Sequence, residues 1–460
     1  MKKSVLIILM LIYSNIIYSQ ENFKKCNTTR LVNTELKNNT DYVNARARLL
    51  NFNLENASGN TLKIPIVIHI VHRNSHQNIG SGTNISNAQI EDQLRILNED
   101  FSKTNPEFPN PPRNTFIASS GNPEIEFCLA TTDPSGNPTS GITRTSTSQI
   151  NWDADDNDNS NPCHESNGMK RNSCGGKDSW DPKRYLNIWV CDLTNSQGSG
   201  MTLGYAYLPG LLANPFNTSD DYKDGLVVDY RYFGTIGVAA ISSDGRTPTH
   251  EIGHYLGLMH TFCEEYDSQG NTICCDNDNN NAGGYVNDTP ASKDIYFGSV
   301  TSSTNNNTCN DLLYANVFSS NVLDMDENYM SYAANTWMFS NSQVDVMLAT
   351  LNTSESNGGR LSLKNSSIST NCSNIISSTN NITSNIRLKF YPNPTKRILF
   401  ISCSEKIELL IVRNIIGTEL IRVKGLKSNY LDLNKLINGI YLLDVKTTTT
   451  QATRKLIIRK

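Results

Sequence analysis

The stretch HEIGHYLGLMH, residues 250–260, is the most informative pattern in the sequence for both fold and chemistry. Residues four apart share one face of an α-helix, so His250 and His254 can direct both imidazoles at one metal ion, with Glu251 beside them. Neutral imidazole nitrogen is a preferred ligand of zinc. The stretch therefore predicts a zinc-binding helix.

The second half of the stretch predicts a third ligand. Gly257 can adopt the left-handed conformation that ends a helix, so the chain can turn and return His260 to the metal. Three protein ligands leave one coordination position for water, as in catalytic zinc sites. Zinc lowers the pKa of bound water toward ~7, and Glu251 is placed to accept its proton as a general base. Three of the seven histidines of the chain fall in this stretch, which makes it much more specific than HExxH alone.

The N-terminus is typical of a secretory signal peptide over residues 1–19. Lys2 and Lys3 precede an apolar stretch from Val5 to Ile17, which is shorter than the roughly 20 residues of a membrane-spanning helix. A membrane anchor is the alternative. Eleven cysteines in an exported chain indicate disulfides, and the odd number leaves at least one thiol free or in an intermolecular bond.

Composition divides the rest of the chain into four parts. Residues 20–60 are polar and rich in Asn, and we expect a propeptide there, with a flexible leader as the alternative. Strands and helices alternate over residues 61–355, which predicts an α/β domain. Residues 356–386 are rich in Ser, Asn, Thr and Gly, and predict a linker. Short strands separated by turns over residues 387–460 predict a small all-β, Ig-like sandwich.

The α/β part contains one strong strand and one strong helix. The run IPIVIHIVHR, residues 64–73, is continuously apolar and suits a buried strand. Ser86 begins a capping box, and apolar residues repeat along one helical face from Ile90 to Phe101. Shorter strands are predicted at residues 125–130, 185–193, 204–208 and 226–232.

Charge separates the C-terminal part from the rest. Residues 388–460 hold 14 Lys+Arg against 5 Asp+Glu, whereas the remainder holds 26 against 39. Such an imbalance favours separate domains. The basic residues are scattered among apolar strands, so we do not expect nucleic acid as a partner.

The extended zinc motif resembles that of the metzincin clan of peptidases. That clan has a methionine-containing turn beneath the metal, and NYMSY, residues 328–332, matches it. The resemblance implies a structural role for Met330, and for Tyr332 a role in stabilising the tetrahedral intermediate. It also implies the fold: a twisted, mostly parallel sheet with the zinc helix, followed by an irregular C-terminal subdomain.

Within that clan, residues 62–350 resemble the pappalysin family, including cytophagalysin-like and ulilysin-like bacterial proteases. The resemblance implies a zinc endopeptidase that hydrolyses protein or peptide substrates by zinc-activated water, with Glu251 as general base. A catalytically silent, zinc-containing surface adhesin is the alternative, but it would need neither Glu251 nor Tyr332. We expect a monomer. The matching segments are GGKDSW (175–180), YLNIWV (185–190), GYA (204–206), DG (224–225), GRT (245–247), HTF (260–262) and DTP (288–290).

The family resemblance also implies a calcium ion and a disulfide near the Asp-Thr-Pro segment. Hard oxygen ligands of the kind that calcium prefers are present there, with a solvated acidic loop as the alternative. The family disulfide would join Cys309 to Cys274 or Cys275, and the sequence leaves that choice open. The expected calcium ligands are Asp276, Asp278, Asp288 and Thr289.

Two further residues match family positions. Cys26 stands where latent relatives carry a propeptide cysteine that occupies the open zinc position, although Asn27 replaces the usual following glycine. A thiolate is a good zinc ligand; an ordinary or disulfide cysteine is the alternative. Arginine-preferring relatives have an Asp five residues after the methionine of the turn, in the substrate pocket. Asn335 stands there, and an amide does not pair with a guanidinium as a carboxylate does, so we predict no strong arginine preference.

Residues 388–460 resemble the C-terminal sorting domain of the type IX secretion system of Bacteroidetes. The resemblance implies Sec export, passage through the periplasm and outer membrane by the type IX machinery, and release or attachment at the cell surface. An Ig-like adhesive or carbohydrate-binding module is the alternative. The matching segments are YPNP (391–394), NIIG (414–417), LDL (431–433), NGIY (438–441) and the basic end (455–460).

Overall fold

The protein is described by a computed structural model. The signal peptide expected at residues 1–19 lies outside the described residues. In the part of the chain that is described, no helix is long and apolar enough to cross a membrane. The described residues are 22–50, 61–155, 163, 165–198, 200–275, 286–314, 316–372, 389–403, 406–414, 419–425, 430–447 and 451–460.

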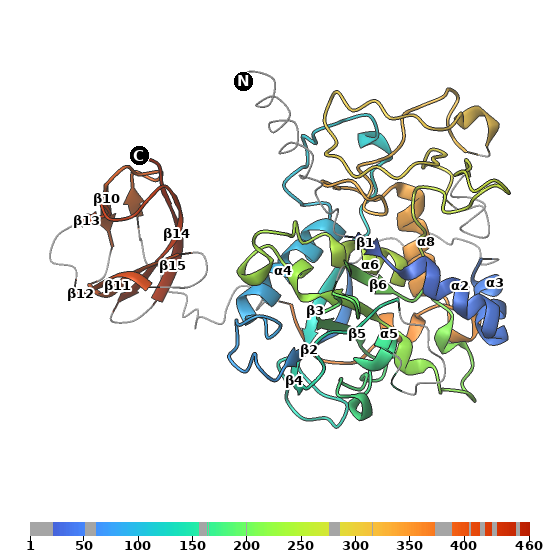
Figure 1. The fold of residues 1–460 in the computed structure, drawn as a ribbon, viewed down its shortest axis with the longest axis horizontal. Coiled ribbons are helices and arrows are strands. Elements are labelled where there is room, and N and C mark those ends of the chain that lie inside the picture. Colours follow the sequence, from blue (N-terminus) through green and yellow to red (C-terminus); the bar gives the residue numbers. More distant parts are fainter. Residues whose placement is uncertain are drawn as a thin grey trace, which may run out of the picture.

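An eight-stranded, mostly parallel sheet forms the centre of the main domain (Figure 1). Its order is β1-β6-β7-β5-β2-β3-β8, and β4 pairs with β2 beyond the point where β3 ends. Only β6 with β7 and β8 with β3 pair antiparallel among the described strands of this sheet. The strands are β1 (Asn22–Cys26), β2 (Leu62–Arg73), β3 (Ile125–Ala130), β4 (Ile142–Thr147), β5 (Leu186–Cys191), β6 (Gly200–Ala206), β7 (Leu226–Asp229) and β8 (Thr370–Asn371).

Side chains on the two faces of β2 belong to two different hydrophobic cores. Ile66, Ile68 and Ile70 belong to the same core cluster as the apolar residues of α4 and α6, whereas Val71 belongs to a second cluster. Because successive side chains of a strand point to opposite faces, the continuous apolar run of β2 serves two cores. The helices are α2 (Thr28–Asn38), α3 (Thr40–Leu50), α4 (Asn87–Phe101), α5 (Glu165–Gly168), α6 (Thr247–Tyr255), α8 (Asn341–Asn352) and α9 (Leu361–Lys364).

The stretch between α6 and α8 is largely irregular, as the resemblance implied. Its described residues contain one 3₁₀ turn, Asp311–Leu313. Two disulfides, Cys263–Cys275 and Cys274–Cys309, cross-link this stretch. Cross-links of this kind stabilise a region with little regular structure by restricting the unfolded chain.

The main domain extends further than the sequence predicted. The linker expected over 356–386 does not begin at 356, because α9 and β8 pack into the domain. Leu363 of α9 is buried in the main core, and β8 pairs with β3. Cys372 forms a disulfide with Cys128 of β3. The boundary expected at residue 355 is therefore wrong, since the chain belongs to this domain at least through Cys372; residues 373–388 lie outside the described part.

Residues 22–50, here called the N-terminal segment, fold against the main domain. β1 adds a parallel strand to the free edge of β6, with Cys26 opposite Gly204. The helices α2 and α3 follow, and Figure 1 shows them beside the sheet edge that β1 extends. The helix expected around residues 42–50 is present as α3.

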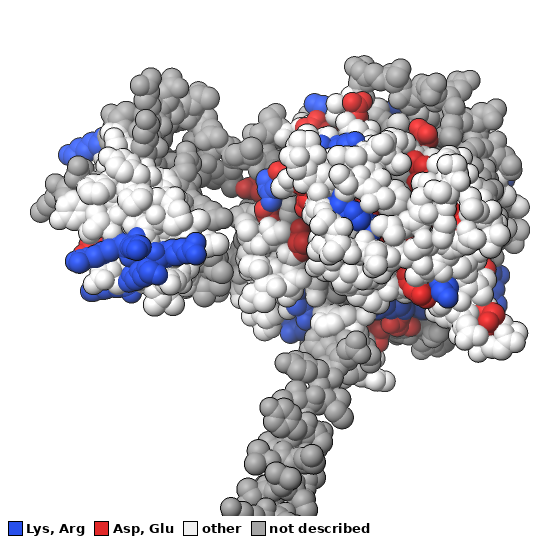
Figure 2. All heavy atoms as spheres, turned by 90° about the horizontal axis from the view of Figure 1, so that it is seen from above, with Lys and Arg blue, Asp and Glu red and all other residues white. Residues whose placement is uncertain are grey.

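The C-terminal part consists of two antiparallel sheets around a core of their own, as the sandwich prediction required. Lys and Arg side chains gather on this part in Figure 2, and exposed Arg422 and Lys424 lie on its outer strand β12. The strands are β9 (Lys389–Tyr391), β10 (Ile398–Ser402), β11 (Ile407–Asn414), β12 (Glu419–Lys424), β13 (Tyr430–Asp432), β14 (Gly439–Thr447) and β15 (Gln451–Ile458).

Candidate active site

The helix α6 and the turn after it bring three histidines together. The helix ends at Tyr255, and Gly257 has φ +107°, which suits glycine because a side chain would be strained there. The amide of Gly257 donates to the carbonyl of His254 at 2.8 Å, and Leu258 N donates to Gly253 O at 3.0 Å. These bonds close the helix and reverse the chain, so that His260 faces the histidines of the helix.

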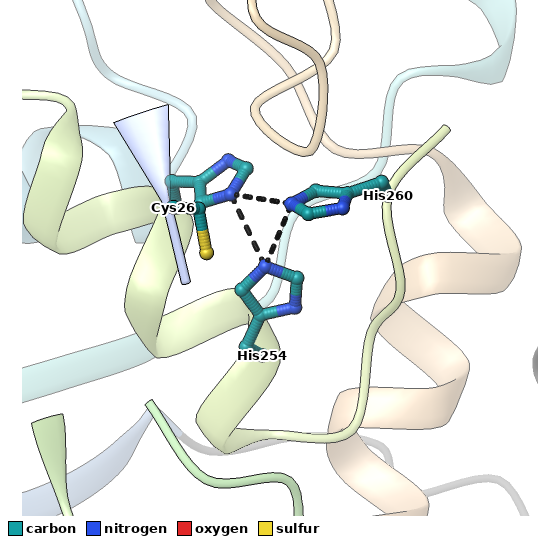
Figure 3. Close-up of side chains that lie close together, drawn as sticks. Cys26, His254 and His260 are labelled. Atoms are coloured by element: carbon teal, nitrogen blue, oxygen red, sulfur yellow. Dashed lines mark hydrogen bonds between the residues drawn. The ribbon is translucent and has the colours of Figure 1, made fainter. Parts of the chain in front are cut away.

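The three imidazoles converge on one point. The Nε2 atoms of His250, His254 and His260 lie 3.1 Å from one another (Figure 3). Each Nδ1 lies against an oxygen: Tyr329 O at 2.6 Å, Leu258 O at 2.7 Å and Glu264 Oε2 at 2.8 Å. Since the Nδ1 atoms donate to these oxygens, the three Nε2 lone pairs face each other.

Such an arrangement suits a cation. Burial, followed by the neighbouring histidines, lowers the pKa of His250 well below its ordinary value, and burial lowers that of His254 to about 3. The rings of His250 and His254 are therefore neutral ligands. A tetrahedral zinc site with bonds of ~2.0–2.1 Å has ligand atoms about 3.3–3.4 Å apart, close to the observed separation. The donor set thus fits zinc.

Cys26 of β1 supplies a fourth ligand atom at the same point. Its Sγ and the three histidine nitrogens all lie within 4.8 Å of one another. Figure 3 shows this sulfur beside the imidazoles of His254 and His260. Burial, together with the nearby Glu251 carboxylate, raises the pKa of the Cys26 thiol well above its ordinary value. A bound cation reverses that preference and favours the thiolate.

Glu251 lies next to the convergence point, fully buried. Its Oε2 accepts hydrogen bonds from Cys26 Sγ at 3.5 Å and from Thr28 Oγ1 at 3.2 Å, while Oε1 has no partner among the described residues. Burial raises the pKa of this carboxyl to about 8. Gly204 of β6 faces it, and a Cβ there would lie 3.0 Å from Glu251 Cγ. Glycine at residue 204 therefore lets β6 pass close to the carboxylate side chain.

The turn that contains Met330 supports the helix from below. Met330 is fully buried, and a Cβ on Gly253 would lie 2.4 Å from its Sδ. The absence of a side chain on Gly253, between the two helical histidines, therefore makes room for the Met330 sulfur. The carbonyl of the preceding residue, Tyr329, orients His250. Tyr332 is buried with its ring centroid 5.0 Å from that of His260, and its hydroxyl interacts with Cys26.

Two polar residues that position the site were not found from the sequence. Asp100 at the end of α4 accepts hydrogen bonds from Thr249 Oγ1 and from the Tyr329 hydroxyl, both at 2.7 Å, and pairs with Arg246. It thus ties the zinc helix to the methionine turn. Glu264 orients His260 through Nδ1. The role of Glu264 could have been suspected from its position four residues after His260. Nothing in the sequence near the motif indicates a role for Asp100.

A cavity of about 680 Å³ opens beside the histidines, lined by Asp244, Arg246, His250, Phe297 and Tyr332 among others. Lys25 of the N-terminal segment enters this cavity. Its Nζ donates to the carbonyls of Tyr332 and Ala333 at 2.6 and 3.0 Å. The cavity adjoins the point on which the three imidazoles converge, here called the metal point.

The side chain of Asn335 binds a neighbouring loop. Its Oδ1 accepts from Val300 N at 2.6 Å and its Nδ2 donates to Val300 O at 3.0 Å. Both amide atoms thus bind the backbone of a neighbouring loop. The adjacent residues Ala334 and Thr336 line the cavity, and Asn335 does not. The pocket role expected of Asn335 stays a prediction.

The residues of the expected calcium site are only partly described. Asp276 and Asp278 lie outside the described residues. Asp288 and Thr289 are buried, and Asp288 accepts from Ser340 Oγ at 2.5 Å and from Ser342 N at 3.0 Å, at the start of α8. For the disulfide, the structure pairs Cys309 with Cys274, one of the two choices that the sequence left open.

Comparison with known proteins agrees with this geometry. Residues 170–352 match the family model of pregnancy-associated plasma protein-A, a peptidase family designated M43. A solved structure of mirolysin in complex with a compound is 32% identical, with a TM-score of 0.51, and covers 67% of this chain and 97% of the mirolysin chain. The chain belongs to the M43 peptidase family.

Further similar proteins agree with this result. A structure of a promirolysin mutant from Tannerella forsythia is 29% identical, with a TM-score of 0.55, and covers 74% of this chain and 97% of its own. An extracellular metalloprotease of Colletotrichum graminicola is 29% identical over 258 residues, 55% of this chain and 69% of the relative. One from Arthroderma otae is 43% identical over 93 residues, 20% and 28% of the two chains.

Residues 389–459 match the secretion system C-terminal sorting domain. Together with the M43 match, this makes the protein an extracellular metalloprotease that carries a sorting domain. The metal implied for such an enzyme is zinc, in agreement with the donor set formed by the three histidines.

Proposed function

We propose that this M43 peptidase is a zinc endopeptidase in which His250, His254 and His260 hold the metal and Glu251 is the general base. The observation that carries the proposal is the convergence of three histidine Nε2 atoms beside one buried carboxylate. Zinc bound there supplies Lewis acidity that polarises a water molecule and the scissile carbonyl.

The residues around the metal point have distinct roles in this proposal. Glu251 accepts the proton of the attacking water and returns it to the leaving amine. The Tyr332 hydroxyl donates a hydrogen bond to the oxyanion of the tetrahedral intermediate. Met330 packs against Gly253 and supports the helix that carries two ligands.

The N-terminal segment keeps the enzyme latent in this proposal. Cys26 occupies the fourth ligand position, and Thr28 and Cys26 hold the Glu251 oxygen that would receive a proton. Lys25 fills part of the adjacent cavity. The promirolysin structure covers a larger share of this chain than the mirolysin structure does, which supports the interpretation of the N-terminal segment as a prosegment.

A fluorescence-quenched casein assay tests the peptidase proposal. Protein from which the N-terminal segment has been removed should cleave casein, lose activity in a zinc chelator and recover it with added zinc. A surface adhesin with a silent zinc site would bind zinc and show no cleavage under any of these conditions.

Calcium is the second cation of the proposal. Asp288 accepts two hydrogen bonds at the start of α8 and has further lone pairs that can bind a cation. Thr289 beside it carries an oxygen of the kind that calcium binds. Asp276 and Asp278 would complete the set. Thermal unfolding of zinc-saturated protein with and without calcium tests this site: an unchanged melting temperature would contradict it.

The sorting domain indicates which export machineries the protein interacts with. We infer that the Sec and type IX machineries carry a monomer through the periplasm to the surface of a Bacteroidetes-type cell, and the match at residues 389–459 supports this route. Deletion of those residues should leave active enzyme inside the cell. Normal secretion of the shortened protein would contradict the route.

A further inference from the structure

The N-terminal segment contacts the main domain at two separate places. Residues 25–29 lie at the metal point and in the cavity beside it. The rest of α2, after Thr29, and α3 lie elsewhere, on a surface formed by the 3₁₀ turns Leu211–Ala213 and Glu355–Asn357, the adjoining Gly210 and Gly358, and Lys223. We call this second surface the docking surface.

Apolar side chains of the helices belong to the core of the main domain. Leu31, Val32 and Tyr42 are buried in the cluster that includes Trp189 and Tyr205 of the central sheet. The Tyr42 hydroxyl donates to Leu208 O at 3.4 Å. The N-terminal segment therefore does not lie loosely on a finished surface but completes one of the two cores.

The backbone of the docking surface is shaped to receive α3. Gly358 has φ +85°, and a Cβ there would lie 2.5 Å from the carbonyl oxygen of Ala45. Gly210 has φ +131°, and a Cβ there would lie 3.1 Å from the Tyr42 ring. Any side chain at residue 358 would hold α3 away from the surface.

Polar contacts fix the orientation of both helices. Glu35 of α2 is buried and forms an ion pair with Lys223 at 2.7 Å. Arg48 Nε of α3 donates to Ser356 O at 3.0 Å. Asn214 Nδ2 donates to Asp41 Oδ2 at 2.7 Å. None of these groups touches the histidines or Glu251, so the docking surface binds the helices independently of the metal.

We propose that the docking surface keeps the N-terminal segment bound after the chain is cut between residues 50 and 61, so that a cut alone does not open the active site. Two linked contacts hold a ligand far more tightly than either alone, because docking of the helices keeps Cys26 at a high effective concentration near the metal point. Opening then requires loss or degradation of α2 and α3. This inference rests on the proposed latency and adds the surface that maintains it.

The test uses the full chain with a specific protease recognition sequence inserted between residues 50 and 61, in a Glu251→Gln background that prevents self-digestion. A fluorophore attached to the N-terminal segment itself reports whether the cut segment stays bound in gel filtration and how fast it leaves on dilution. Glu35→Gln removes the charge opposite Lys223 with little effect on packing. Tyr42→Ala removes an apolar contact. The matched controls are Lys37→Gln and Val43→Ala, exposed positions on the same two helices.

Retention of the cut segment by the parent and by both controls supports the inference. A chelator or Cys26→Ala should leave most of the segment bound, whereas Glu35→Gln should release it at least about tenfold faster, because it leaves Lys223 without this partner in the interface. Tyr42→Ala should release it faster still; if that variant does not fold, Glu35→Gln alone decides. Immediate loss of the segment on cutting, or release from Cys26→Ala as fast as from Glu35→Gln, would overturn the docking surface.

The test also separates this inference from the latency on which it rests. Binding is measured without reference to activity. If the segment stays bound and the same cut chain with Glu251 intact is fully active, the docking surface stands and the latency proposal fails. If the segment leaves at once and activity appears with it, latency stands and the docking surface fails.

Discussion

The hydroxyl of Thr28 donates a hydrogen bond to Oε2 of Glu251 over 3.2 Å. The Oγ1 atom of Thr28 also accepts a hydrogen bond from Ala206 N of β6 at 2.9 Å. One residue of the N-terminal segment therefore joins the sheet edge to the proposed general base. Cys26, two residues earlier, lies at the fourth ligand position. The segment thus blocks the metal and the base at once, through two different side chains.

Cys26→Ala should raise the casein-cleaving activity of the intact chain, because it opens the fourth ligand position. The rise should be partial, on the order of tenfold, since Thr28 and the helices still hold the segment over Glu251. Cys26→Ala with Thr28→Val should be more active again. Cys403→Ala, which changes another free cysteine, is the control. If Cys26→Ala were no more active than Cys403→Ala, a latency role for Cys26 would be contradicted.

Glu264→Ala should weaken zinc binding by about 10–100-fold, because His260 loses the carboxylate that fixes its ring and tautomer. Glu264→Gln keeps an acceptor oxygen and should lose less. Competition with a chromophoric chelator measures the affinity without reference to catalysis. The neighbouring exposed Glu265→Ala should leave it unchanged. An affinity in Glu264→Ala equal to that of Glu265→Ala would show that the 2.8 Å bond to His260 has no such role.

Gly253→Ala should destabilise the domain by ~1–3 kcal/mol, because the added methyl group would meet Met330 Sδ in a filled core. The clash is relieved by a shorter side chain, so Gly253→Ala with Met330→Ala should be less unstable than the sum of the two single changes. Denaturant unfolding of the three variants measures this coupling. Strict additivity would mean that residues 253 and 330 do not share a contact.

The zinc-binding stretch could be predicted because its geometry is local. Helical spacing places His250 and His254 on one face, and Gly257 alone permits the reversal that returns His260. Long apolar runs such as β2 and β3 were predicted for the same kind of reason. By contrast, β1 and β4 were missed because NFKKC and ITRTST lack an apolar run, and they form strands by pairing with the edges of β6 and β2.

Roles that depend on distant contacts could not be predicted. Asp100 binds Thr249 of the zinc helix from 149 residues earlier in the chain. Asn335 was placed by counting from Met330, but its amide binds Val300, which the count does not show. The Ser- and Asn-rich composition after residue 355 indicated a linker, whereas the disulfide between Cys372 and Cys128 holds that stretch in the main domain.

Lys170 should make stability rise with pH above neutrality. It is fully buried among Trp189, Tyr205 and Tyr207, and burial lowers its pKa from 10.5 to about 7. Because the folded-state pKa lies below the unfolded one, the unfolded chain holds more protons between pH 7 and 10.5, and the free energy of unfolding rises across that window. Denaturant titrations at pH 7.5 and 9.5 should show the rise in wild type and in exposed Lys63→Met, and a smaller one in Lys170→Met. A slope unchanged in Lys170→Met would contradict the assignment.

The most direct test of the zinc peptidase compares Glu251→Gln with wild type after removal of the N-terminal segment, measuring bound zinc per chain and casein turnover on the same samples. Glu251 is not a ligand, so the variant should keep one zinc per chain while its turnover falls by ~10²–10⁴-fold, the usual contribution of a general base. Full turnover per bound zinc in Glu251→Gln would contradict the account.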